Sequence, residues 1–214
     1  MTEAVIFDLD GIVVDTVPLH YRAWKRMFSE YGKDFSFEDY KEKVDGIPRL
    51  DGARAVLDSL NEKELENAAE RKQVYFRELL DSGDIPQYES TVTLIKKLRR
   101  ENVPIAVISS SRNCSHILKK IGIYQILNSV VDGNRRLPGK PRPDIFLAAA
   151  EETEADPAGC VVFEDALLGV ESAKSAGMFV IGVDRYGDPK RLKGADLTIS
   201  DASEISLEEL LSLV

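Results

Sequence analysis

Cysteine and long apolar runs are both scarce in this chain. Its 214 residues include two cysteines, Cys114 and Cys160. These are too few for a disulfide framework, so we interpret both as free, small apolar side chains. No apolar run approaches the roughly 20 residues of a membrane-spanning helix. The apolar stretch near the N-terminus is short and is interrupted by Asp8 and Asp10, unlike a secretory signal. We therefore expect a cytoplasmic protein without a membrane partner.

Positive charge is in deficit. The chain has 28 lysines and arginines against 37 aspartates and glutamates, for a formal net charge of -9. This balance disfavours non-specific binding to nucleic acid. Hydrophobic residues make up 43% and charged residues 30%, as in ordinary soluble globular proteins. The length fits one domain with an insert or two small domains, and we expect a monomer.

Short apolar runs alternate with helical patterns along much of the chain. The strong runs lie at residues 4–7, 105–108, 160–163 and 179–183, and weaker ones at 129–131 and 196–199. Continuous apolar strands separated by helices are typical of a parallel sheet covered on both faces. We therefore predict an α/β fold with a Rossmann-like, three-layer core. We expect Ser90 to cap one helix, Pro143 to begin another, and Gly122 and Gly177 to follow helix ends.

One long segment breaks this alternation. Residues 17 to about 87 contain helical patterns but no convincing strand. Roughly 90 residues therefore separate the first two strands, far more than a single crossover helix needs. We predict an all-helical cap domain at residues 17–86, inserted into a catalytic core that comprises residues 1–16 and 87–214.

Polar side chains follow the predicted strands, at the edge of the sheet where open parallel sheets bind ligands. They are Asp8 and Asp10, then Ser109, Ser110, Ser111, Arg112 and Asn113, then Lys140, and finally Glu164 and Asp165. Converging carboxylates favour a cation between them, and oxygen ligands suit Mg²⁺. A lysine and a hydroxyl suit a phosphoryl group. A carboxylate near the metal can attack phosphorus to form an aspartyl-phosphate, and Asp10, two residues on, could act as general acid and base.

Each of these signals has a simpler interpretation when it stands alone. An Asp-x-Asp after a strand is often a polar strand end or a turn. Glu164 and Asp165 would suit the N-cap of a helix that starts near Leu167. The serines would suit a capping loop, and Lys140 a solvated loop. Four such signals at converging strand ends are hard to obtain by chance, so together they predict a site.

The segments that carry these residues resemble the four motifs of the haloacid dehalogenase-like phosphotransferases. The matching segments are D-L-D-G-I-V-V-D-T (8–16), V-I-S-S-S (107–111), G-K-P-R-P-D-I-F (139–146) and V-V-F-E-D-A-L-L-G-V-E-S-A-K-S-A-G (161–177). The resemblance implies that Asp8 is the nucleophile and Asp10 the acid and base. It implies that Ser109 and Lys140 hold the transferring phosphoryl group. The implied Mg²⁺ ligands are Asp8, the Asp10 carbonyl and Asp165, with Glu164 beside them.

The resemblance extends to the β-phosphoglucomutase branch of that family, which carries a small helical cap. The segments H-Y-R-A-W (20–24), D-G-I-P-R (45–49), E-R-K-Q (70–73) and S-S-S-R-N (109–113) are similar to that branch's cap and loop segments. The implied substrate-binding residues are His20, Trp24, Gly46, Arg49, Lys72, Ser110, Ser111, Arg112 and Asn113. Among them, Arg49, Ser111, Arg112 and Asn113 would hold the phosphate that is not being transferred.

A second anion site would separate a mutase from a simple phosphatase. A mutase that works through a bisphosphate needs two such sites, and arginine offers a bidentate fork to phosphate. The simpler interpretations stay open: Arg49 as a surface charge, Arg112 as a first-turn helix residue, and Lys72 as a solvated charge. His20 and Trp24, four residues apart on one helix face, could serve packing alone.

Two positions depart from the branch's pattern. Arg112 stands where the branch has lysine, which keeps the charge but changes the donor geometry. Pro48 stiffens the cap loop and removes a backbone donor. Both departures bear on sugar preference.

We predict a Mg²⁺-dependent phosphomutase. As the resemblance implies, it interconverts β-D-glucose 1-phosphate and D-glucose 6-phosphate through an aspartyl-phosphate at Asp8 and a β-glucose 1,6-bisphosphate. The alternative on the same residues is a phosphatase of small sugar phosphates, in which water takes the phosphoryl group. A more remote alternative is a non-catalytic regulatory domain that is phosphorylated without turnover; Ser109, Lys140 and the cap argue against it.

Overall fold

The computed structural model describes residues 1–45 and 47–214. The chain divides into two compact units. Met1–Asp15 and Pro86–Val214 form the first, which we call the core unit, and Thr16–Ile85 form the second, the helical unit.

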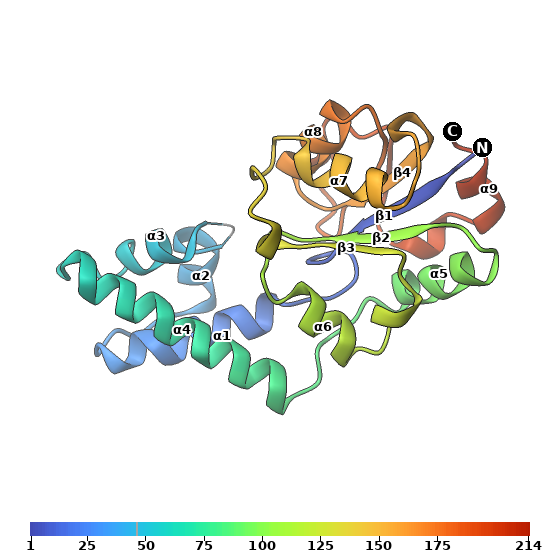
Figure 1. Cartoon of the computed structure of the whole chain (residues 1–214). Coiled ribbons are helices and arrows are strands. Elements are labelled where there is room, and N and C mark those ends of the chain that lie inside the picture. Colours follow the sequence, from blue (N-terminus) through green and yellow to red (C-terminus); the bar gives the residue numbers. More distant parts are fainter. Residues whose placement is uncertain (46) are drawn as a thin grey trace. The chain divides into compact units, whose positions relative to one another are not determined.

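A six-stranded parallel sheet forms the centre of the core unit (Figure 1). Its strands are β1 (Ala4–Asp8), β2 (Ile105–Ile108), β3 (Ser129–Val131), β4 (Cys160–Glu164), β5 (Phe179–Val183) and β6 (Leu197–Ile199). Their spatial order is β3-β2-β1-β4-β5-β6. Every residue of β1, β2 and β4 is buried, as expected for strands covered on both faces. The predicted α/β fold is confirmed.

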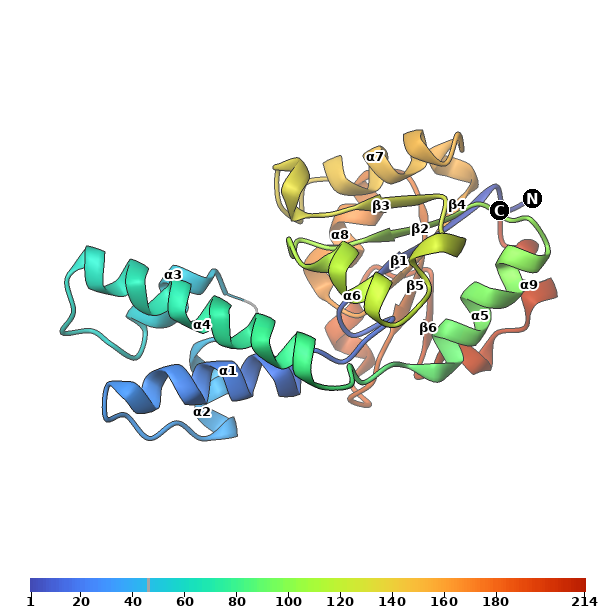
Figure 2. The same cartoon turned by 60° about the horizontal axis from the view of Figure 1, so that its bottom comes forward.

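Helices cover both faces of this sheet (Figure 2). α7 (Asp144–Glu152) and α8 (Leu167–Ser175) pack on one face, together with alternate residues of the strands such as Ile6, Ala106 and Val162. α5 (Glu89–Arg100), α6 (Cys114–Lys120) and α9 (Leu207–Leu211) lie on the other face. Short 3-10 helices occupy the connections, at η1 (Tyr124–Ile126), η2 (Gly133–Arg135), η3 (Pro157–Gly159), η4 (Pro189–Leu192) and η5 (Ala202–Glu204).

The helix boundaries agree with the sequence at three of four predicted positions. Pro143 is the N-cap residue of α7. Gly122 and Gly177 follow the C-caps of α6 and α8 with positive φ angles of 76° and 81°, a conformation that glycine adopts without a steric penalty. The prediction for Ser90 was wrong. α5 begins at Glu89, with Tyr88 as its N-cap residue, so Ser90 lies inside the first turn. The Ser90 hydroxyl donates to Asp201 Oδ2 at 2.7 Å.

The helical unit contains α1 (Val17–Glu30), α2 (Phe37–Lys43), α3 (Arg49–Arg54) and α4 (Glu62–Ser82). The two long helices, α1 and α4, run side by side (Figures 1 and 2). Apolar residues spaced three and four apart on α1, including Trp24, Met27 and Phe28, form a buried cluster with residues of α4 such as Leu65 and Ala68. Capping boxes begin α2 and α4, because the side chain of the N-cap and that of the third helical residue each accept a backbone N–H from the other.

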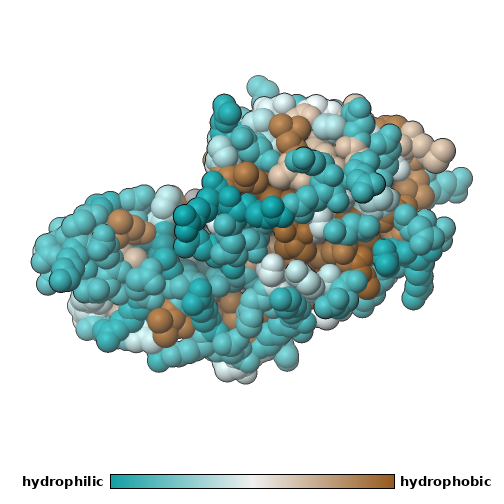
Figure 3. All heavy atoms as spheres, viewed as in Figure 1, coloured by the Kyte–Doolittle hydropathy of each residue, from teal (hydrophilic) through white to brown (hydrophobic). Residues whose placement is uncertain are grey.

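The surface is mostly hydrophilic on the face that Figure 3 shows, with scattered groups of apolar residues. No helix in the described part of the chain is long and apolar enough to span a membrane.

Candidate active site

The ends of β1 and β4 bring two carboxylates together. Phe7 and Phe163 are register partners on these neighbouring strands, and their rings stack with centroids 4.9 Å apart. The next residue on each strand is an acid, Asp8 on β1 and Glu164 on β4. The parallel register of β1 and β4, in which these rings stack, therefore places both carboxylates at one edge of the sheet.

Lys140 joins these two carboxylates. Its Nζ lies 2.7 Å from Asp8 Oδ1 and 2.9 Å from Glu164 Oε2. Burial alone would lower the pKa of Lys140, but the charges of Asp8 and Glu164 raise it above its usual value, so the ammonium is charged at neutral pH. Glu164 is only 1% exposed, and burial raises its pKa despite the opposing effect of Lys140.

Glu164 fits its buried position because Gly169 has no side chain. A Cβ atom at Gly169 would lie 1.9 Å from Glu164 Oε1. Gly169 was not among the predicted residues, although a glycine inside the helical pattern five residues after an acid was the available signal. We assign it to making room for the Glu164 carboxylate.

Asp10 and Ser109 form a second pair at the same edge. The Ser109 hydroxyl donates to Asp10 Oδ2 at 3.2 Å and accepts the backbone N–H of Ser111 at 3.0 Å. The Ser111 hydroxyl in turn accepts the N–H of Asn113 at 3.1 Å. The serines therefore do shape the loop, as the simpler interpretation held, and Ser109 also reaches a predicted catalytic acid. Ser110 and Arg112 are exposed to solvent.

Asp165 lies against the turn that follows Asp10. Gly11 has a φ of 84°, and a Cβ atom there would lie 2.0 Å from Asp165 Oδ2. Burial raises the pKa of Asp165 to about 7, and the charges of Asp8 and Asp10 add to that effect. Asp165 is thus close to Asp8 and Asp10 of the first motif. Neither Glu164 nor Asp165 caps α8, whose N-cap is Ala166 without a side-chain cap.

These carboxylates have the chemistry that a hard cation requires, because all of their donors are oxygen. Burial is the main cause of the raised pKa values of Glu164 and Asp165, and the charges of neighbouring carboxylates add to it, so a cation between these acids would stabilise their ionised forms. Within the described residues, no group of three or more acids, histidines or cysteines has the arrangement of a ready metal site. One Asp8 oxygen is already hydrogen-bonded to Lys140.

The helical unit contains its own cluster of predicted residues. His20 of α1 stacks on Phe76 of α4 with ring centroids 4.0 Å apart. Lys72 Nζ lies 2.8 Å from His20 Nδ1 and lies over the rings of Trp24 and Phe76 at 5.2 and 5.0 Å from their centroids. Lys72 is 4% exposed, so the interpretation of a solvated charge was wrong. Burial and then the positive charge of Arg49 lower the pKa of Lys72 to about 7.

Arg49 begins α3 in the same unit. Its Nη2 lies 2.9 Å from Glu70 Oε1, and its side chain is 35% exposed. Glu70 was not among the predicted residues, and the signal available for it was its position two residues before Lys72. The predicted Gly46 lies outside the described residues.

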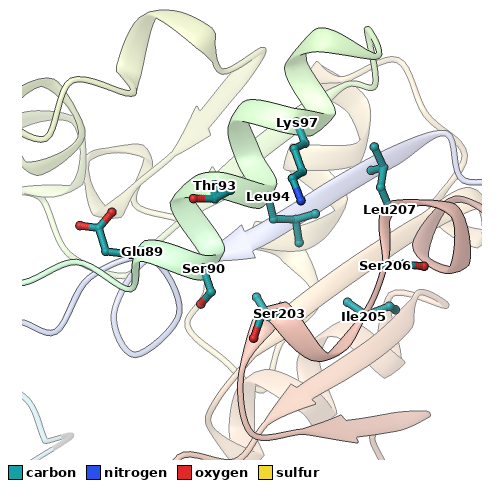
Figure 4. Close-up of a pocket in the computed structure, with 10 residues that line it drawn as sticks. Glu89, Ser90, Thr93, Leu94, Lys97, Ser203, Ile205, Ser206 and Leu207 are labelled. Carbon is teal, nitrogen blue, oxygen red and sulfur yellow. The ribbon is translucent and has the colours of Figure 1, made fainter.

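Among the hollows on the surface of the core unit, one borders the site and a larger one does not. The smaller, of about 130 Å³, borders the site and is lined by Ser109, Lys140 and residues 137–139 among others. The larger, of about 390 Å³, lies elsewhere, between α5 and the segment that precedes and begins α9 (Figure 4). It contains none of the predicted site residues, so its size does not make it the active site.

A family model described as haloacid dehalogenase-like hydrolase matches residues 5–183. The chain belongs to this family. The match spans all four segments that resemble its motifs, so the family expected from the residues is confirmed.

Relatives within the family include both a mutase and a phosphatase. The chain is 35% identical over 215 residues to β-phosphoglucomutase of Bacillus subtilis (strain 168), covering 97% of this chain and 93% of the relative. It is 34% identical over 181 residues to a phosphorylated carbohydrates phosphatase of Thermotoga maritima, covering 82% of each. Among solved structures, β-phosphoglucomutase from Clostridium difficile is 30% identical with a TM-score of 0.80, covering 98% of this chain and 96% of that one. Sequence identity alone therefore does not show whether this chain is a mutase or a phosphatase.

Proposed function

We propose that this chain is a Mg²⁺-dependent phosphomutase that interconverts β-D-glucose 1-phosphate and D-glucose 6-phosphate through a β-glucose 1,6-bisphosphate. The observation that carries this proposal is Lys72. Its ammonium is buried and, within the described residues, forms no ion pair. A buried cation without a carboxylate costs free energy, which an anionic ligand would recover. Arg49 lies in the same unit as Lys72. These two cations could bind a second phosphate, in addition to the cations of the core unit.

In this proposal the core unit performs the phosphoryl transfer. A carboxylate oxygen of Asp8 forms a bond to phosphorus as the bond from phosphorus to the sugar oxygen breaks, which gives an aspartyl-phosphate. Lys140 lies against Asp8 and would reduce the repulsion between this carboxylate and the incoming anion. When substrate binds, the Ser109 hydroxyl, which has a single proton, would turn from Asp10 and donate its hydrogen bond to the transferring group.

Asp10 would move the proton. It would protonate the sugar oxygen as that oxygen leaves, and remove a proton from the sugar hydroxyl that takes the phosphoryl group back. Its hydrogen bond from Ser109 supports this role, because it orients the Asp10 carboxylate beside the hydroxyl that would contact phosphate.

Asp8, the Asp10 carbonyl, Glu164 and Asp165 would hold the Mg²⁺ ion. When bound, the ion would neutralise charge on the phosphoryl oxygens. The chain's own part is to keep these oxygen ligands at the ends of β1 and β4, with Glu164 also fixing Lys140.

A phosphatase of small sugar phosphates is the second candidate. It is favoured by the ion pair between Arg49 and Glu70, because that pair already engages the guanidinium that a second phosphate would need. Glu70 is 71% exposed and Arg49 35%, and ion pairs at the surface contribute only about 0–1 kcal/mol, so a phosphate could displace Glu70.

Phosphorus NMR tests the proposal directly. The protein is incubated with β-glucose 1-phosphate, Mg²⁺ and a trace of the 1,6-bisphosphate. We expect the glucose 6-phosphate signal to grow while little free phosphate forms. Free phosphate as the main product would overturn the mutase in favour of the phosphatase.

A further inference from the structure

Arg185 links three separate segments of the core unit. It follows β5, and its Nε donates to the carbonyl of Gly11 at 2.8 Å. Its guanidinium carbon lies 3.4 Å from the centroid of the Tyr88 ring. Its Nη1 lies 3.4 Å from Asp201 Oδ2, and its side chain is 17% exposed. None of the motifs described above includes Arg185.

The carbonyl that Arg185 contacts belongs to the turn that carries Asp10. Within this turn the Gly11 N–H donates to the Val14 carbonyl at 2.9 Å. The backbone N–H of Tyr88 donates to the Val13 carbonyl at 3.0 Å. Arg185 therefore contacts the turn through Gly11 and also stacks on Tyr88, the residue that holds the other side of the turn.

The Asp201 carboxylate fixes the far end of the guanidinium. Burial would raise its pKa, but hydrogen bonds from Ser203, Ser90 and Arg185 lower the pKa of Asp201 to about 2, so it is ionised at neutral pH. Ser90 reaches it from α5 with its hydroxyl at 2.7 Å. The guanidinium thus lies between a fixed anion and the Gly11 carbonyl.

The contact uses the shape of arginine as well as its charge. Nη2 is buried and has no hydrogen-bond partner within the described residues, so the site does not use every donor of the group. The flat face of the guanidinium stacks on the Tyr88 ring, and its Nε–H points to the Gly11 carbonyl. A lysine ammonium has no flat face and no such fork, so it cannot replace both contacts.

We propose that Arg185 is a positioning residue that holds the Asp10–Gly11 turn so that the Asp10 carboxylate is oriented for proton transfer. This inference rests on the proposed function only in taking Asp10 as the acid, and it holds for a mutase and a phosphatase alike. Arg185 acts through the backbone of Gly11 and does not contact the reacting atoms in this role.

The test is a series of phosphate esters whose leaving groups differ in basicity. We compare an alkyl ester, glucose 6-phosphate, with phenyl phosphate and 2,4-dinitrophenyl phosphate under single-turnover conditions with Mg²⁺. A basic leaving oxygen needs a proton from Asp10, whereas dinitrophenolate needs almost none. Arg185→Met should slow cleavage of the alkyl ester by at least about tenfold and leave the dinitrophenyl ester within about threefold. A loss of the same factor across the series would overturn the inference, since it would indicate a general structural defect.

Arg191 provides the matched control. Its guanidinium also lies over a tyrosine ring, with its carbon 4.1 Å from the centroid of Tyr186, and the residue is exposed. Arg191→Met should match the wild type on every ester. If it reproduces the steep loss of Arg185→Met, the contact to Gly11 is not the cause and the inference fails.

A chemical rescue and a second variant keep the test decisive if Arg185→Met folds poorly. Added ethylguanidinium should restore alkyl-ester cleavage in Arg185→Gly at least about threefold, without changing cleavage of the dinitrophenyl ester. Arg185→Lys should show the same selective loss as Arg185→Met, with slow cleavage of the alkyl ester and nearly normal cleavage of the dinitrophenyl ester. If Arg185→Lys instead cleaves every ester at the wild-type rate, the guanidinium does not have the proposed role. A wild type that neither cleaves any of the esters nor converts β-glucose 1-phosphate to glucose 6-phosphate would overturn the proposed function, and this inference with it. If the wild type is active but Arg185→Met loses the same factor on every ester, this inference fails and the proposed function stands.

Discussion

Replacing Lys72 by methionine should stabilise the helical unit while weakening its affinity for phosphate. Methionine has a similar length and fills the same space among Trp24, Phe76 and His20 without a charge. The pKa of Lys72 falls from 10.5 to about 7 in the folded protein. At roughly 1.4 kcal/mol for each pKa unit, keeping this lysine charged costs about 5 kcal/mol at pH values below 7.

Three contacts offset part of that cost. The hydrogen bond to His20 contributes about 1 kcal/mol, and the two ring contacts about 0.5–1 kcal/mol each. The net gain of Lys72→Met is therefore on the order of 2–3 kcal/mol at pH 6.

The pH dependence has a definite sign. Below pH 7 the lysine is charged in both the folded and unfolded states, so the full cost is present. Between about 7 and 10.5 the unfolded chain binds more protons than the folded one, so wild-type stability rises with pH in this window. The advantage of Lys72→Met should therefore be largest below pH 7 and should shrink toward pH 10.

Urea unfolding at pH 6 and pH 9 measures both the gain and its pH dependence. Lys63→Met is the matched control, because Lys63 lies exposed on the same helix, α4. Added phosphate should stabilise the wild type more than Lys72→Met, since an anion relieves the cost of the buried ammonium. A Lys72→Met protein that is less stable than the wild type at pH 6 would refute the reasoning.

Four further changes test the core-unit site and the Lys72–Arg49 cluster of the helical unit. Asp8→Asn should reduce turnover of every phosphate ester by at least about a thousandfold, and mass spectrometry should find no phosphorylated protein; detectable phosphorylation elsewhere would identify a different nucleophile. Arg49→Ala should reduce mutase activity far more than hydrolysis of an aryl phosphate, and equal losses would favour the phosphatase. Glu70→Gln should lower the KM for the sugar phosphate by about two- to fivefold with little change in kcat, because it frees Arg49, and an unchanged KM would rule out this competition. Gly169→Ala should lower the free energy of unfolding by about 1–3 kcal/mol, since its Cβ would meet Glu164, and an unaltered urea midpoint would contradict that clash.

The core sheet could be predicted from the sequence because its strands are buried on both faces. Such strands read as continuous apolar runs, and their carboxyl ends share one edge, which places Asp8 and Glu164 together without knowledge of any contact. The helix start near Ser90 could not be predicted in the same way. Ser90 has a competing partner, Asp201, 111 residues away, and local capping preferences do not include it.

The contacts that orient the candidate residues, within the core unit and within the helical unit, join positions far apart in the sequence. The resemblance named Lys72 and His20, but the two residues are 52 positions apart, and the charge pattern of the helix gave no sign that this lysine turns inward. Arg185 and Gly11 are 174 residues apart. The family motifs located the acids and Lys140. The residues that orient them, such as Arg185, act through tertiary contacts that a local sequence pattern does not predict.

The charges of the core unit also explain why a cation is part of the proposed function. Asp8, Asp10, Glu164 and Asp165 are four acids, and Lys140 is the cation paired among them, so the site carries three negative charges when all five are ionised. A phosphate dianion approaching such a site would be repelled, and more strongly as burial lowers the local dielectric. A divalent ion bound by the acids would remove most of this excess and leave Lys140 and Ser109 to contact the phosphate. The cluster of Lys72 and Arg49 in the helical unit has the opposite balance. Within the described residues, Arg49 pairs with Glu70 and no carboxylate pairs with Lys72, so this cluster can attract a phosphate without a metal. This difference in charge supports the assignment of phosphoryl transfer to the core unit and of the non-reacting phosphate to the helical unit.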